Sequence, residues 1–219
     1  MLLYAITDRR MFAGNERDRQ EAIVTQACRL AAGGISILQL REKDLPDKDL
    51  EALAARVVEA VRTSGATARE VPLTRVILNG PAHIAVTAGA AGVHLRGGAG
   101  GGELGRVRQT FKLAGLDNPI VSVSCHSVEE VRAAAFAGFE DILFGPVFEK
   151  CVRGHRIAPG LGLDRLRQAS EVALASRLIA LGGVTDANAH TCLAAGAAGI
   201  AGIRIFSELA SSLNFPGPG

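Results

Sequence analysis

The fold is decided by a junction that the chain repeats, seen first in Ala32-Gly33-Gly34-Ile35-Ser36-Ile37-Leu38-Gln39-Leu40-Arg41. The glycine pair ends the helical pattern before it, because glycine readily adopts the left-handed backbone that closes a helix. The apolar run from Ile35 to Arg41 then has the composition and length of a β-strand. This stretch therefore predicts the end of a helix followed directly by a buried strand.

The same junction recurs along the chain, with Ala-Gly pairs at residues 91–92, 137–138, 195–196 and 198–199. Strands are predicted at 3–7, 35–41, 76–79, 92–95, 120–125, 141–144, 178–181 and 199–204. Helices are predicted at 19–32, 47–64, 81–88, 103–113, 127–137, 164–175, 186–195 and 206–212. Because one helix follows each strand, we expect an α/β protein with parallel strands and outer helices.

Eight such units favour a closed (β/α)8 TIM barrel over residues 1–213, followed by a flexible tail at 214–219. An open doubly wound sheet has the same alternation of strands and helices. However, Asp8-Arg9-Arg10 follows the first strand where a dinucleotide-binding sheet of that kind has Gly-x-Gly-x-x-Gly. The closed barrel is therefore the favoured fold.

Composition excludes several classes of function. The 219 residues are 48% hydrophobic, and 24 Lys+Arg against 22 Asp+Glu give a net charge of +2, with no Trp and one Tyr. Such a chain lacks the basic patches and stacking aromatics of a nucleic-acid binder. It also lacks an apolar run long enough to span a bilayer. The 4 Cys are too widely spaced for a zinc or disulfide framework, which predicts reduced thiols and a cytoplasmic protein. The sequence is compatible with a homo-oligomer but does not determine one.

The carboxyl ends of barrel strands carry the candidate site residues, because active sites of TIM barrels form there. Gln39, Arg41 and Lys43 share one face at the end of the second strand, opposite Leu40 and Glu42. Cations at a packed barrel mouth need an anionic partner, and a phosphate or pyrophosphate ligand would supply one. The alternative is that Arg41 and Lys43 pair with acids on neighbouring strands or extend into solvent.

The fifth strand places Ser124 and His126 on one face, so that a histidine at the strand tip lies beside hydroxyl groups. Histidine transfers protons near neutral pH, which makes His126 a candidate acid or base. The alternative is a structural histidine with satisfied hydrogen bonds. His94 is less favoured because it lies inside its predicted strand.

Two further segments are candidates for anion binding. The basic connection at 148–162, which includes Lys150, is predicted to be a lid or binding loop without regular structure. Glycines at the ends of the last two strands would let backbone N–H groups approach a phosphate, with tight packing turns as the alternative. The phosphate-binding candidates are Gly182, Gly183, Gly202, Ile203 and Arg204, of which Arg204 either adds charge at a phosphate or blocks it.

Several stretches, in order, resemble the thiamine-phosphate synthase superfamily over nearly the whole chain. They are Leu3-Tyr4-Ala5-Ile6-Thr7-Asp8, Gln39-Leu40-Arg41-Glu42-Lys43, Gly92-Val93-His94-Leu95, Ser124-Cys125-His126-Ser127-Val128-Glu129-Glu130, Phe144-Gly145-Pro146-Val147-Phe148-Glu149, Ala180-Leu181-Gly182-Gly183 and Gly199-Ile200-Ala201. The resemblance implies a (β/α)8 barrel that joins a pyrimidine pyrophosphate to a thiazole phosphate, with Mg²⁺ held by two aspartates.

The chain departs from that pattern at both expected aspartates. Asn79-Gly80 follows the third strand, and Arg96 followed by glycines and alanine follows the fourth. Thiazole tautomerases of the same superfamily need no metal, carry Asn-Gly at the first position and use a histidine in a Ser-x-His-Ser segment, which His126 matches. The resemblance therefore implies a tautomerase-like isomerase, without cofactor, that aromatises a carboxythiazole phosphate by a proton shift.

In that interpretation His126 moves the proton, Arg41 and Lys43 hold a carboxylate, and Gln39 and Asn79 orient the ring. Ser124 and Lys150 would also contact the substrate, a phosphorylated thiazole. The first alternative is a thiamine-phosphate synthase that recruits Mg²⁺ through its substrate or through Asp8 or Glu149. The second alternative is a non-catalytic protein that binds thiazole or thiamine phosphate.

Overall fold

The structure is a computed structural model that describes residues 1–65, 73–152 and 155–207, with the backbone alone at 150–152 and 155–158. The eight barrel strands are β1 (Leu2–Ile6), β2 (Ile37–Leu40), β3 (Arg75–Leu78), β4 (Gly92–Leu95), β5 (Ile120–Cys125), β6 (Asp141–Phe144), β9 (Arg177–Leu181) and β10 (Gly199–Gly202). They form a closed barrel in the order β1-β10-β9-β6-β5-β4-β3-β2. The predicted (β/α)8 barrel is confirmed, and each strand coincides closely with a predicted apolar run.

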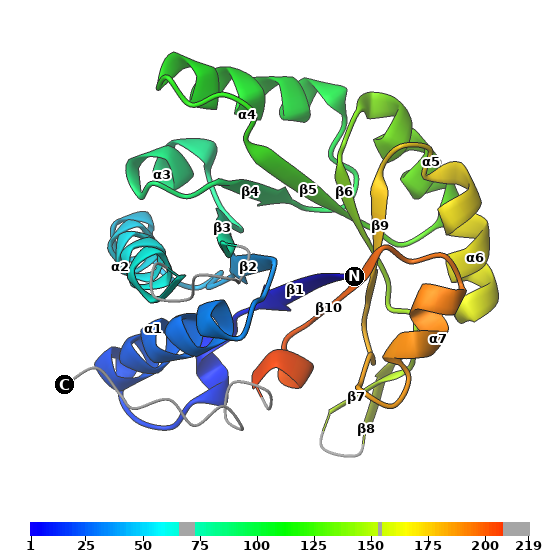
Figure 1. Cartoon of the computed structure of the whole chain (residues 1–219), viewed down its shortest axis with the longest axis horizontal. Coiled ribbons are helices and arrows are strands. Elements are labelled where there is room, and N and C mark those ends of the chain that lie inside the picture. Colours follow the sequence, from blue (N-terminus) through cyan, green and yellow to red (C-terminus); the bar gives the residue numbers. More distant parts are fainter. Residues whose placement is uncertain (66–72, 153–154, 208–219) are drawn as a thin grey trace. The chain divides into compact units, whose positions relative to one another are not determined.

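Helices follow the strands along the chain, as the colours of Figure 1 trace. They are the 3-10 helix η1 (Arg9–Met11), α1 (Glu16–Ala32), α2 (Asp47–Gly65), α3 (Ala82–Thr87), α4 (Gly101–Leu113), α5 (Val128–Ala137), α6 (Leu163–Val172) and α7 (Ala189–Ala194). Local chemistry sets their ends. Asn15 and Asp18 form a reciprocal capping box at the start of α1, and Gly138 closes α5 with φ of 89°.

The chain divides into two compact units, each of which packs its own helices on its own strands. The first contains Met1–Leu3 and His94–Gly202, and the second contains Tyr4–Val93 and Ile203–Gly219. In the second unit α1 packs against α2, and the fully buried side chains include Ile23, Leu38 and Leu53. In the first unit α5 packs against α6, and Phe139 and Phe144 are fully buried.

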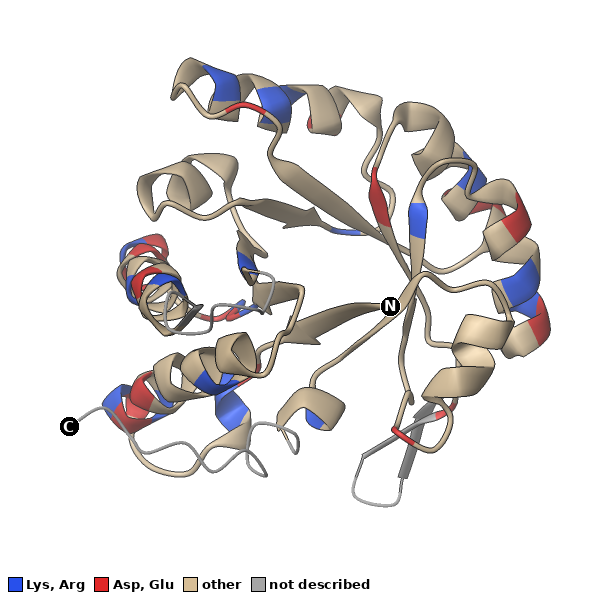
Figure 2. Ribbon diagram, in the orientation of Figure 1, with Lys and Arg blue, Asp and Glu red and all other residues tan. Residues whose placement is uncertain are grey.

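Charged residues lie mainly on the helices, whereas most of the strand surface is uncharged (Figure 2). The strands therefore supply the apolar interior that the composition predicted. An exception is the pair at the amino ends of β6 and β9, where Asp141 is fully buried and accepts two hydrogen bonds of 2.6 and 2.8 Å from Arg177. Among the described residues no helix combines the length and apolar character needed to cross a membrane.

The basic connection at 148–162 differs from its prediction. It contains two short strands, β7 (Lys150–Val152) and β8 (His155–Ala158), which pair antiparallel with Cys151 opposite Arg156. The prediction of a connection without regular structure is wrong, because backbone hydrogen bonding between the two arms overrides a charge-rich sequence. The final predicted helix begins as a helical turn at residues 204–207, and residues 208–219 lie outside the described part.

Candidate functional site

The second strand presents its polar residues in two different environments. Gln39 is fully buried, and its side-chain amide donates to the Tyr4 hydroxyl at 3.1 Å. Arg41 is half-buried and Lys43 is exposed, because the chain leaves the barrel wall after β2 ends at Leu40. In the described part of the chain, neither the Arg41 nor the Lys43 side chain forms an ion pair. Pairing with acids is therefore not seen in the described residues, and the arrangement is compatible both with anion binding and with extension into solvent.

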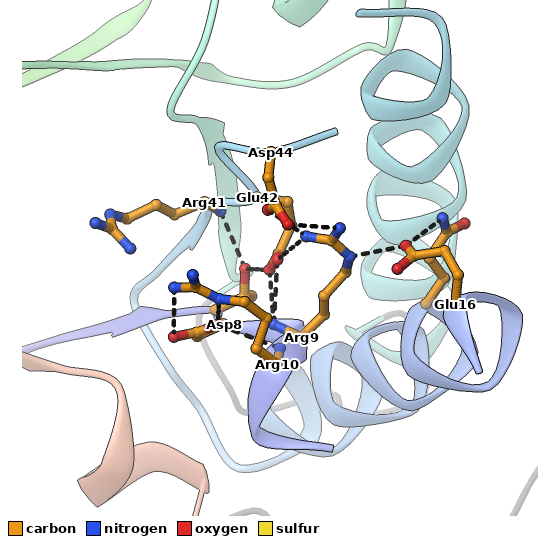
Figure 3. Close-up of polar contacts among 9 residues, drawn as sticks. Asp8, Arg9, Arg10, Glu16, Arg41, Glu42 and Asp44 are labelled. Carbon is orange, nitrogen blue, oxygen red and sulfur yellow. Dashed lines mark hydrogen bonds and ion pairs between the residues drawn. The ribbon is translucent and has the colours of Figure 1, made fainter. Parts of the chain in front are cut away.

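The neighbouring acids pair instead with two arginines from the connection after β1, as Figure 3 shows. Arg9 is buried and bonds to Glu42, Asp44 and Glu16. Arg10 is exposed and bonds to Asp8 at 3.0 Å. Partial burial alone would raise the pKa of Asp8, but the hydrogen bonds from Arg10 outweigh it and lower that pKa below its ordinary value. Neither Arg9 nor Glu42 was predicted from the sequence, although Glu42 shares the predicted strand face of the apolar Leu40 and a carboxylate buried there would need a partner.

A second polar group lies on β4 and β5. The ring of His94 contacts two hydroxyls, with Nδ1 2.8 Å from Ser122 Oγ and Nε2 2.9 Å from Ser124 Oγ. His94 and Ser122 are buried, whereas Ser124 is half-buried. His94 was less favoured in the sequence because it lies inside its strand, and its contacts with the two serines were not predicted. The available signal was that Ser122 and Ser124 lie on one face of the next strand.

His126 lies directly after β5 and is exposed, but its position is fixed on two sides. Its backbone N–H donates to Glu130 at 2.6 Å, and its ring Nδ1 lies 2.6 Å from the carbonyl oxygen of Gly145. A carbonyl oxygen only accepts, so Nδ1 carries a proton and donates it. In the neutral ring, Nε2 is then the atom left to accept a hydrogen bond. Gly97 packs beside this edge of the ring: a Cβ there would lie 3.6 Å from Nε2.

The glycines after β9 form a tight junction with the segment after β6. Gly182 and Gly183 have φ of 93° and 67°, and a Cβ on Gly182 would lie 2.6 Å from Pro146. Phe148 donates its backbone N–H to the Gly182 carbonyl at 3.0 Å, and Asn188 donates to the Gly183 carbonyl at 3.0 Å. These contacts account for both glycines as packing residues. They engage the carbonyl groups, whereas the N–H groups have no acceptor among the described residues.

The remaining candidates lie at other strand ends. Gly202 ends β10, which pairs with β9 in a register that aligns Ala201 with Leu181, so Gly182 and Gly202 lie next to each other. Ile203 is half-buried and Arg204 is exposed at the start of the last helical turn. Asn79 is half-buried after β3. The side chain of Lys150 lies outside the described residues.

The structure thus gathers the candidates into two separate groups. Gln39 and Arg41 belong to the group around β1 and β2 in one unit. Ser124, His126, Gly182, Gly183 and Gly202 belong to the ends of β5, β9 and β10 in the other unit. The described residues contain no group of three or more His, Cys, Asp or Glu side chains that could hold a metal ion.

Comparisons with known proteins identify the family of the chain. The thiamine monophosphate synthase family matches residues 3–206. A Geobacter sulfurreducens protein named "Putative thiamine-phosphate synthase" is 36% identical over 91% of this chain and 83% of its own length. The thiamine-phosphate synthase of Methanoculleus marisnigri is 33% identical over 91% of this chain and 84% of its own length. The structure of a Pyrococcus furiosus thiamine phosphate pyrophosphorylase has a TM-score of 0.70 at 21% identity, covering 98% of this chain and 97% of that one.

These relatives overturn the expectation of a tautomerase-like isomerase. That expectation relied on Asn79-Gly80 and on the Ser-x-His-Ser segment around His126. In the structure this segment has local roles: Ser127 caps α5 by accepting from the Glu130 N–H, and His126 donates to Gly145. A motif that builds a helix start is weak evidence for a proton shift, whereas the relatives at 33–36% identity carry the synthase name. The chain belongs to the thiamine monophosphate synthase family.

Proposed function

We propose that the protein is a thiamine-phosphate synthase, a transferase that joins a pyrimidine pyrophosphate to a thiazole phosphate and releases pyrophosphate. Its family and its relatives' names support this activity. The structural observation that carries the proposal is the pair of cations after β2, Arg41 and Lys43, with no acidic partner among the described residues. Displacement of pyrophosphate concentrates negative charge on the leaving group, and fixed cations stabilise such charge.

Arg41 and Lys43 would hold the pyrophosphate. Guanidinium groups bind phosphate oxygens through two parallel N–H donors, and an ammonium group adds a point charge. Arg41 is half-buried, so its attraction to an anion is less screened by water than that of a fully exposed arginine. Gln39 is less suited to direct substrate contact, because its amide already donates to Tyr4.

The thiazole phosphate would bind at the ends of β9 and β10. Gly182 and Gly183 have N–H groups without an acceptor among the described residues, and Gly202 ends the adjacent strand. Phosphate binding to backbone N–H groups in such glycine turns is common in TIM barrels. Ile203 and Arg204 follow Gly202 directly in the sequence. Ser124 would contact substrate through its hydroxyl, which His94 orients at 2.9 Å.

The described residues do not fit a protein-bound Mg²⁺. Magnesium in phosphate sites is ordinarily held by one or two carboxylates together with substrate phosphates. Gly80 stands where the family resemblance places the Asp of an Asn-Asp pair, and Arg96 followed by glycines and alanine stands where it places a second Asp. Asp8 is already bonded to Arg10. We therefore assign pyrophosphate binding to the positive charge of the chain's own side chains.

The direct test is to incubate the purified protein with both substrates and to follow thiamine phosphate by mass spectrometry, with and without Mg²⁺. We expect product, and we expect Arg41→Met to raise KM for the pyrimidine pyrophosphate by about tenfold or more, because one cation–pyrophosphate contact is lost. The matched control is Arg62→Met, which removes an exposed arginine paired with Glu59 on α2 and should leave KM unchanged. Absence of product under both metal conditions would refute the proposal.

A further inference from the structure

Acidic residues surround the two cations after β2 along the chain. Glu42 lies between Arg41 and Lys43, Asp44 follows directly, and Asp8 is close enough for Arg41 to lower its pKa. Any of these carboxylates could pair with Arg41 or Lys43 and compete with an incoming anion. The structure shows instead that all of them are bonded to other groups.

Arg9 binds most of these acids. Its side chain is 5% exposed, and its Nε lies 2.7 Å from Glu16 while Nη1 lies 2.7 Å from Asp44 and 3.2 Å from Glu42. The hydrogen bond from Arg9 lowers the pKa of both Asp44 and Glu16, which keeps them ionised and bonded to Arg9. Hydrogen bonding, first of all to Asp44, raises the pKa of Arg9 itself.

Glu42 connects this cluster to the backbone of Arg41. Its buried carboxylate accepts from the Thr7 hydroxyl at 2.6 Å and from the Arg9 backbone N–H at 3.1 Å. The Thr7 oxygen in turn accepts from the Arg41 N–H at 3.0 Å. Figure 3 shows the Arg41 side chain directed away from the guanidinium of Arg9. One hydroxyl therefore links the buried acid to the residue that carries the free cation.

We propose that Arg9 and Glu42 are positioning residues for the pyrophosphate site: Arg9 withholds Glu42 and Asp44 from Arg41 and Lys43, and Glu42 fixes the backbone of Arg41 through the Thr7 hydroxyl. The inference rests on the proposed function, because it assigns these residues to the binding of that substrate's pyrophosphate. Both side chains are buried and already bonded to groups of the protein, so both act through Arg41 and Lys43. A merely structural cluster would affect stability without affecting anion affinity.

The test measures the Kd of inorganic pyrophosphate by titration calorimetry on folded variants. Arg9→Lys keeps the charge but loses the planar fork of donors that holds three carboxylates. We expect Asp44, which is exposed, to turn toward Lys43 or Arg41 and to weaken pyrophosphate binding about tenfold. Adding Asp44→Asn removes the released charge and should recover most of the affinity, and KM for the pyrimidine pyrophosphate should follow the same order with kcat little changed.

The matched control is Asp141→Asn, which disturbs another buried acid paired with an arginine, at the amino ends of β6 and β9. It should lower the melting temperature and leave the Kd unchanged. If Arg9→Lys does not fold, the double variant Arg9→Gln/Glu42→Gln removes the buried charges together and is measured in its place, again with and without Asp44→Asn.

A folded Arg9 variant that binds pyrophosphate within about twofold of the wild type would overturn the inference, since twofold is well under 1 kcal/mol. A loss that Asp44→Asn fails to reduce would overturn it as well. In either case wild-type synthesis of thiamine phosphate would leave the proposed function standing. If the wild type bound no pyrophosphate and formed no product, both proposals would fail together.

Discussion

Gly199 offers the sharpest test of how the barrel closes, because it meets β1 at very short range. An alanine Cβ at this position would lie 2.1 Å from the carbonyl oxygen of Leu2 and 2.8 Å from the Leu2 Cβ. A close carbon–oxygen contact is about 3.3 Å, so one strand must move by roughly 1 Å. That shift acts on backbone atoms, which cannot swing aside as the end of a flexible side chain can.

The expected cost follows from two contributions. Overpacking in a well-packed interior costs about 1–3 kcal/mol. The displacement also strains the hydrogen bond from the Leu2 N–H to the Ala198 carbonyl, which is 3.1 Å long, and a typical hydrogen bond contributes about 1 kcal/mol. We therefore expect Gly199→Ala to lower the free energy of unfolding by about 3 kcal/mol, which corresponds to a fall in Tm of roughly 6–12 °C for a domain of this size.

The control is a glycine in a different setting. Gly105 lies exposed in the interior of α4 with nothing within 4 Å of an added Cβ. Gly105→Ala should raise the free energy of unfolding by about 0.5–1 kcal/mol, because alanine loses less backbone entropy in a helix. Urea titration followed by circular dichroism measures both variants. A Gly199→Ala protein as stable as the wild type would show that the approach of β10 to β1 is not a tight constraint.

Three further outcomes can be checked. Arg9 lowers the pKa of Asp44, so the ionised Asp44 stabilises the fold above the unfolded pKa of about 4. This contribution is lost as the pH falls through the lower folded pKa. Asp44→Asn should therefore flatten the decline in the urea midpoint between about pH 5 and pH 2. Burial raises the pKa of Cys125 to about 12, so iodoacetamide at about pH 8 should label this thiol only after unfolding, as peptide mass mapping would show. Arg177→Ala leaves Asp141 buried and unpaired and should lower the free energy of unfolding, measured by urea titration at neutral pH, by about 3–5 kcal/mol. The decrease should be smaller in acid, where Asp141 becomes protonated.

The sequence predicted the barrel well because its signals are local. An Ala-Gly pair followed by a short apolar run specifies a helix end and a strand start without any long-range information, and residues 92–95, 120–125 and 141–144 were located without error. The hairpin at β7 and β8 was missed because its pairing joins two arms of a charged segment whose composition is typical of a loop. The cytoplasmic location and the domain boundary at residue 213 stay predictions.

Prediction of the site was less complete, since its key contacts join residues distant in sequence. The two-residue period of a strand predicted Arg41 and Lys43 as site residues, and this stays a prediction. Arg9 was not found, because its three acidic partners come from different elements and only the fold brings them to one guanidinium. The tautomerase interpretation failed because it relied on a few residues, Asn79-Gly80 and His126, whereas relatives that are 33% and 36% identical over 91% of this chain carry the synthase name.

The Thr7 hydroxyl, which donates to Glu42 and accepts from the Arg41 N–H, has a consequence for loop exchange between barrels. The connections at the carboxyl ends of TIM-barrel strands are commonly regarded as interchangeable modules on a constant scaffold. Here the connection after β2 depends on the connection after β1, which balances its charges and holds its backbone. A graft of residues 41–46 into another barrel would carry over the cations without the groups that keep them unpaired. The smallest transferable unit is the pair of connections, with Thr7 and Arg9 on one and Arg41, Glu42 and Lys43 on the other.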